Sequence, residues 1–141
     1  MASLKDIRDA FKTTLETAIP FIHVYDTVPD AAGIFPCVVV MPTSADFDVA
    51  FGRGTDTWEF DLLVMASYND PDIAQDQVDE LISGAGDNSV RQAIFQNRSL
   101  GLSNVDAHIS TAFNYGSTFS EGGIPHIGAT LHAIVHTRGY E

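Results

Sequence analysis

The chain has 141 residues, which predicts a single domain, 1–141, large enough to bury its own hydrophobic core. A composition that is 45% hydrophobic and 18% charged is typical of a globular protein and argues against disorder. Seven Lys and Arg against nineteen Asp and Glu give a formal net charge of −12. This charge argues against recognition of DNA or RNA, because phosphate binding needs clustered cations. The acidity serves either solubility alone or a specific role.

The sequence shows no sign of a disulfide, an export signal or a membrane span. The single cysteine, Cys37, excludes an intrachain disulfide and a CxxC zinc motif, and its apolar surroundings predict a buried core thiol. The N-terminus lacks the apolar segment of a signal peptide, and no apolar run approaches the roughly 18 residues of a membrane span. We therefore expect a protein that has no membrane partner and crosses no membrane by the usual route.

An amphipathic helix is predicted from Leu4 to Thr17, because apolar residues recur at spacings of three and four. These residues are Leu4, Ile7, Phe11 and Leu15. The polar face carries Lys5, Arg8 and Lys12, three of the seven cations. It is either a docking face or a solvated face with local ion pairs.

Three strands are predicted next. Phe21–Tyr25 is a short strand, and Phe35–Met41 is apolar on both faces, as in a central strand. Residues 42–50 alternate weakly and predict an arm of a hairpin that runs into the third strand. In that strand the even positions are apolar and define a core-facing row: Trp58, Phe60, Leu62, Val64 and Ala66. We expect this row to be buried with Val38, Val40 and Phe11.

The second half of the chain predicts two helices and a long hairpin. A helix from Pro71 to Ser83 begins with a proline in its first turn, and a short helix, Val90–Phe95, is capped by Ser89. Alternating strands follow at Val105–Phe113 and Ile127–Val135, with a Gly/Ser-rich loop between them, Asn114–Gly123. This order predicts an α+β fold: one mostly antiparallel sheet with helices packed on one face.

No residue pattern predicts catalysis, a metal site or a cofactor. His126, His132 and His136 share one face of the last strand, but positions four apart on a strand lie about 13 Å apart, too far for one ion. The glycines near Arg53 and at 84–86 lack the further residues of a phosphate-binding loop. Acid pairs such as Asp46 with Asp48 lack apolar neighbours that would separate their pKa values. We expect a protein that is not an enzyme and uses no cofactor.

Several stretches, read in order, resemble the small tail terminator (tail completion) proteins of siphophages, especially phages that infect actinobacteria. They are spread over nearly the whole chain: Met1–Ala10, Tyr25–Pro29, Phe51–Asp56 leading into the Trp58 strand, Ser89–Ala93, Asn114–Gly116 and Ile127–Ala129. The resemblance implies a sheet with helices against it, in a homohexameric ring that caps the tail tube. It implies contacts with the major tail tube protein and the head-side stopper or connector, and passage of DNA through the ring without specific binding. The protein would act in the virion neck, after assembly in the host cytoplasm.

The ring interpretation gives roles to two groups of residues. Long loops that carry aromatic side chains and one isolated cation predict contacts between subunits or with the tube, through Phe47, Phe51, Arg53, Asp56, Tyr115 and Phe119. Acids that face the lumen would repel DNA phosphates, and the candidates are Asp46 and Asp48, or Asp76, Asp79 and Glu80. Two alternatives stay open: a head-to-tail stopper or other neck connector subunit, and an α+β ligand-binding module, which would need a concave pocket with convergent polar groups.

Overall fold

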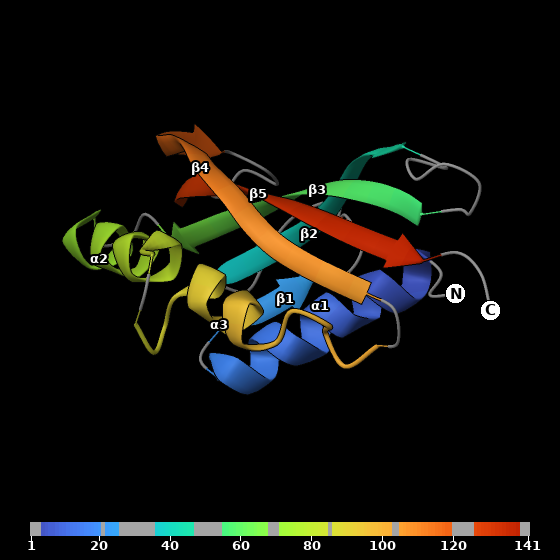
Figure 1. Ribbon diagram of the computed structural model, residues 1–141. Coiled ribbons are helices and arrows are strands. Elements are labelled where there is room, and N and C mark those ends of the chain that lie inside the picture. The colour runs from blue at the N-terminus through green and yellow to red at the C-terminus, as the bar shows by residue number, and fades with distance from the viewer. Residues whose placement is uncertain are drawn as a thin grey trace.

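In the part of the chain that the computed structural model describes, a five-stranded mixed sheet carries three helices on one of its faces (Figure 1). The structure describes residues 4–20, 22–25, 36–46, 55–67, 71–84, 86–102, 105–119 and 126–138. The elements in chain order are α1 (Leu4–Ala18), β1 (His23–Tyr25), β2 (Cys37–Asp46), β3 (Thr55–Ser67), α2 (Pro71–Ile82), α3 (Val90–Gln96), β4 (Val105–Phe119) and β5 (His126–Arg138). The predicted α+β class is confirmed.

The strands lie in the order β1-β2-β3-β5-β4, so β3 occupies the centre of the sheet. β1 pairs with β2 in parallel, and every other neighbouring pair is antiparallel. The prediction of a mostly antiparallel sheet is therefore confirmed. The two outer strands differ in length, since β1 has 3 residues and β4 has 15.

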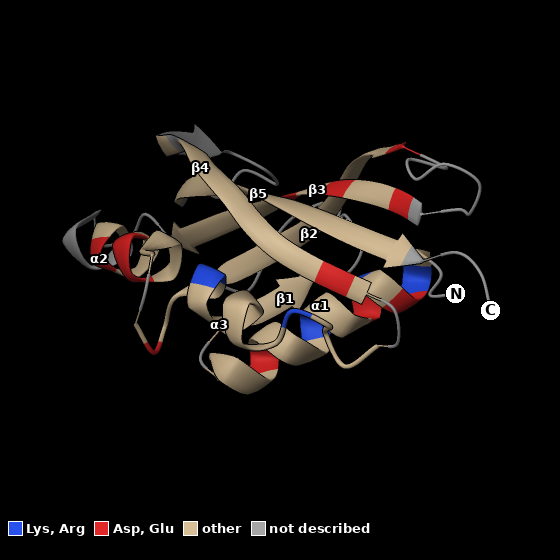
Figure 2. Cartoon of the chain, in the orientation of Figure 1, with Lys and Arg blue, Asp and Glu red and all other residues tan. Residues whose placement is uncertain are grey.

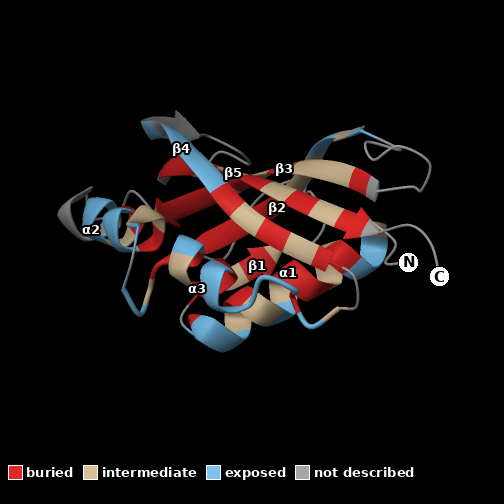
Figure 3. Ribbon diagram, in the orientation of Figure 1, coloured by how far each residue is buried: buried red, intermediate tan, exposed pale blue. Residues whose placement is uncertain are grey.

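The core lies between the sheet and the helices. Phe60, Leu62 and Val64 of β3 are fully buried, and the rings of Phe60 and Phe11 of α1 meet edge to face with centroids 5.2 Å apart. Ile94 of α3 belongs to the same apolar cluster, and α2 places Val78 against the continuation of this face. Figure 3 shows the alternation of buried and less buried residues along β4 and β5 that a sheet covered on one face produces. The core-facing row is confirmed, although Trp58 is only partly buried.

Local signals explain where the helices begin. The Ser89 hydroxyl accepts a hydrogen bond from the N–H of Gln92 at 3.1 Å, as predicted for the cap of α3. α1 buries Ile7, Phe11 and Leu15 as predicted and continues to Ala18, two residues before Pro20.

In the part of the chain that the structure describes, none of the helices has the length and apolar character needed to cross a membrane.

Register shifts interrupt the pairing of β2 and β4, and those in β4 correct the predicted pattern. In β2 the shift lies between Pro42 and Ser44, and the strand continues to Asp46, which confirms the first part of the predicted arm; residues 47–54 lie outside the described residues. In β4 the shift falls between Ile109 and Thr111, so Ala112 rather than Thr111 pairs with Leu131. One extra residue moves all following side chains to the other face. The predicted alternation is therefore wrong beyond Ile109, and Phe113 pairs with Thr130 on the face away from the helices.

The predicted loop Asn114–Gly123 is also wrong in its first part. β4 runs through this stretch to Phe119, with a further irregularity between Phe113 and Ser117. Long-range pairing of Ser117, Thr118 and Phe119 with β5 overrides the local preference of the Gly/Ser-rich sequence for a loop.

Replacing Phe60 by Ala should lower the free energy of unfolding by about 3–5 kcal/mol, because the substitution leaves a cavity against Phe11. Urea unfolding followed by circular dichroism measures the change. Phe95→Ala is the matched control, because Phe95 is 57% exposed and its loss should change stability by less than about 0.5 kcal/mol. A loss below about 1 kcal/mol for Phe60→Ala would mean that this row does not form the core.

Candidate functional site

A polar network crosses the sheet on the face away from the helices. It joins Ser44 of β2, Glu59 and Asp61 of β3 and His132 of β5, which the strand register brings together. The Ser44 hydroxyl donates to Glu59 Oε2 at 2.9 Å. His132 Nε2 lies 2.8 Å from Glu59 Oε1, and its Nδ1 lies 3.3 Å from Asp61 Oδ1. The network therefore ties three neighbouring strands together through side chains.

The electrostatics of the network favour a charged Glu59. The hydrogen bond from Ser44 lowers the pKa of Glu59, and the hydrogen bond and charge of His132 lower it further, whereas burial acts in the opposite direction. Carboxylates only accept hydrogen bonds, so His132 donates to Glu59 and Asp61 together only when both ring nitrogens carry a proton. A protonated ring also offsets the repulsion between the two acids.

A pair of histidines lies on the same face. The rings of His108 and His136 stack with centroids 6.0 Å apart, and His136 Nδ1 lies 3.1 Å from the Thr57 hydroxyl. Burial lowers the pKa of His108, and the neighbouring His136 and Arg98 lower it further. Arg98 itself makes two contacts of 2.8 and 3.0 Å with the Asp106 carboxylate.

The arrangement can neutralise charge and connect strands, and the hydroxyl and thiol that the structure describes near it are both weakly activated. The Ser44 hydroxyl donates to Glu59, whose lowered pKa makes its carboxylate a weak base, and burial raises the pKa of the Cys37 thiol to about 12, which keeps it protonated. Among the residues that the structure describes, no three His, Cys, Asp or Glu side chains form a group that could hold a metal ion. His132 and His136 have separate partners.

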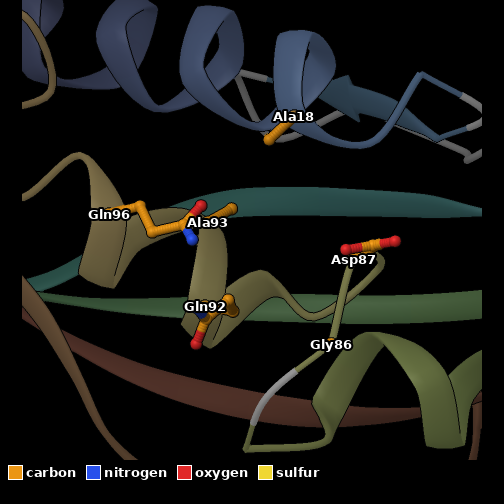
Figure 4. A pocket seen from close by; sticks show the side chains of 6 residues that line it. All are labelled: Ala18, Gly86, Asp87, Gln92, Ala93 and Gln96. Atoms are coloured by element: carbon orange, nitrogen blue, oxygen red, sulfur yellow. The ribbon is translucent and has the colours of Figure 1, made fainter.

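A cavity of about 350 Å³ lies between the end of α1, residues 86–87 and α3. Figure 4 shows the six residues that line it: Ala18, Gly86, Asp87, Gln92, Ala93 and Gln96. The lining offers two amides and one carboxylate, which can form hydrogen bonds. The described lining residues include no histidine, cysteine or serine.

The candidate lumen acids lie at exposed positions where the structure describes them. Asp76, Asp79 and Glu80 are exposed on α2, where Figure 2 shows acidic residues gathered, and Asp46 is exposed at the end of β2. Asp48 lies outside the described residues. No Lys or Arg occurs between Arg53 and Arg91, so the α2 acids have no cationic neighbours along the chain.

The candidate contact residues fall into three groups. Phe47, Phe51 and Arg53 lie outside the described residues. Asp56 is only 7% exposed, and Phe119 ends β4. Tyr115 is 47% exposed, and its hydroxyl donates to Asp79 and accepts from Gln75 Nε2 at 3.1 Å. The contact with Asp79 raises the pKa of Tyr115, and the structure thereby joins a candidate contact residue to a candidate lumen acid.

Sequence reasoning missed the polar network. The only signal in the sequence is the pair of polar residues at odd positions of β3, Glu59 and Asp61, a pattern that is typical of a strand face open to water. Their contacts with His132 depend on the register of β3 and β5, which the local sequence pattern does not specify.

Removing the Ser44 hydroxyl should raise the pKa of Glu59 toward its ordinary value, because that hydrogen bond is the main cause of the lowering. The Ser44→Ala variant can be compared with wild type by NMR titration of the Glu59 carboxyl carbon. Thr43→Ala is the matched control, because the Thr43 hydroxyl donates to the main-chain carbonyl of Glu59 instead. An unchanged titration in Ser44→Ala would contradict the network.

The lowered pKa of Glu59 predicts how the contribution of the network to stability depends on pH. The pKa of Glu59 is lower in the folded than in the unfolded state, so its contribution to stability is present above the unfolded value of about 4.3. That contribution is lost as the pH falls through the folded pKa.

No protein-family model and no curated protein matches this chain. A functional assignment therefore depends on the residues of the chain and on their arrangement.

Proposed function

We propose that the protein is a structural virion protein, a ring-forming tail terminator that caps the tail tube, stops its growth and joins the tail to the head connector. The motifs that resemble siphophage tail terminators motivate the proposal, and the α+β fold agrees with what that resemblance implies. The observation that carries it is the exposed acidic surface of α2, formed by Asp76, Asp79 and Glu80 in a protein of net charge −12.

An acidic surface suits a channel through which DNA must pass without binding. Each phosphate of the duplex carries a negative charge, so acids on the channel wall repel it, whereas clustered Lys and Arg would retain it. The partners in this proposal are five further copies of the chain, the tail tube protein and the head-side connector.

Acids gathered around a ring axis also repel one another. Two unit charges 4 Å apart in water repel by about 1 kcal/mol, and salt screens this repulsion. The attraction between subunits must therefore come from other surfaces. Added salt should favour a ring of this kind.

Sedimentation velocity from about 0.05 M to about 1 M sodium chloride tests this prediction, because the Debye length falls severalfold over that range. The ring fraction should rise with salt. A variant with Asp76→Asn and Glu80→Gln should form rings at lower salt. The control, Asp6→Asn with Asp9→Asn, makes the same charge change on α1, where Lys5 already pairs with Asp9 at 2.9 Å, and should behave more like wild type.

A ring that is present at low salt and dissociates as salt rises would contradict the acidic lumen, because ion pairs would then hold the subunits together. A second assay separates the terminator from the alternative of a neck stopper. A terminator added to polymerising tail tube protein should bind the tube end and stop growth, and a stopper should leave growth unchanged.

A further inference from the structure

The second half of β4 is an open sheet edge whose own side chains include no Asp, Glu, Lys or Arg. In the described part of the chain β5 is the only strand that pairs with β4, so its other side is an edge of the sheet. The first half of that edge is covered, since the Ala107 N–H donates to the Arg98 carbonyl at 2.7 Å and Arg98 pairs with Asp106. Beyond the register shift, the side chains from Ser110 to Phe113 and that of Tyr115 are exposed (Figure 3). We call Ser110–Phe119 the open edge.

The open edge combines apolar exposure with an absence of charge in its own side chains, although Tyr115 contacts Asp79 of α2. Of the large hydrophobic side chains exposed in the described residues, Phe113 and Tyr115 lie on it, and the third, Phe95, lies on α3, which contacts β4. Residues 107–119 contain no Asp, Glu, Lys or Arg, although the protein has a net charge of −12. Exposed strand edges are normally protected by Lys or Pro, and this segment has neither. A cavity of about 110 Å³ beside Ser110 and Ala112, lined also by Ile82, Ile109, Leu131 and Arg91 of α3, could accept a small side chain, and Arg91 is the one charged residue of its described lining.

A second open edge lies on the opposite side of the sheet. β1 covers only Cys37–Val39 of β2, and no other described strand pairs with the outer side of Val40–Asp46. This stretch carries one charge, at Asp46. Pro42 lacks an N–H and suits an edge position, so pairing there would use mainly the residues that follow it.

We propose that the open edge of β4 binds the Val40–Asp46 edge of a second copy of this chain by strand addition. Copies of a strongly acidic protein repel one another over most of their surface, so they approach at least electrostatic cost where the contacting backbone is nearly neutral. A contact between two different edges is head-to-tail, and repeated contacts of this kind can close into a ring. The closure of these contacts into a ring rests on the proposed function, whereas the contact between two copies can be tested by itself.

Two variants test the contact by blocking one edge each. Thr111→Lys with Phe113→Lys places charges on the β4 edge, and Thr43→Lys with Asp46→Lys places them on the β2 edge. Sedimentation velocity at high salt should show that each variant loses self-association, with the apparent dissociation constant raised roughly tenfold or more. The control, Thr13→Lys with Thr17→Lys, adds two cations at exposed positions of α1 and should associate like wild type. Thermal unfolding of each variant identifies any that is simply misfolded.

Mixing the two blocked variants gives the decisive result. Each retains one intact edge, so the mixture should form a 1:1 heterodimer that grows no further. Unchanged self-association of a folded β4-blocked variant would overturn the proposal, as would a mixture that stays monomeric. A heterodimer together with a wild-type protein that forms open chains and no rings would support the edge contact and contradict the terminator function.

Discussion

The edge-to-face contact between Phe11 and Phe60 joins α1 to the central strand, and the arrangement of the other surfaces depends on it. Because β3 directs its fully apolar row toward α1, the remaining helices must cover the same face to bury Ile94 and Val78. The opposite face then takes the polar side chains Glu59, Asp61 and His132, beside a second, smaller buried cluster of Cys37, Val39 and Met65. Because the helices cover one face, they do not cover the two edges of the sheet. The outer strands β1 and β4 form these edges, and part of each edge has no described pairing partner.

Much of the fold follows from local periodicity. The three-and-four spacing of α1, the even-numbered row of β3 and the Ser89 cap each specify an element through nearest neighbours along the chain. The register shifts at Thr43 and Ser110 do not, because one extra residue changes the pairing without changing the composition. The exposure of Asp76, Asp79 and Glu80 on a helix also followed from the local pattern. The extension of β4 to Phe119 and the hydrogen bond between Tyr115 and Asp79 did not, because both depend on strand pairing.

The distribution of charge connects the acidic surface with the open edges. The α2 acids and the net charge of −12 disfavour contact between copies, and an uncharged strand offers a limited surface where contact is less costly. Copies would repel one another over most of their surface and would pair only along a strand edge. Their association would therefore be directional. A ring needs directional contacts, because non-directional attraction between copies would lead to aggregation.

Electron microscopy of the purified protein at high salt, with the mass of the particles measured on the same sample, tests the central claim most directly. The account predicts closed rings with a central opening, six-fold symmetry and the mass of six chains. Monomers at every concentration, or compact dimers related by a two-fold axis, would contradict it, because neither can arise from head-to-tail pairing that closes around a channel.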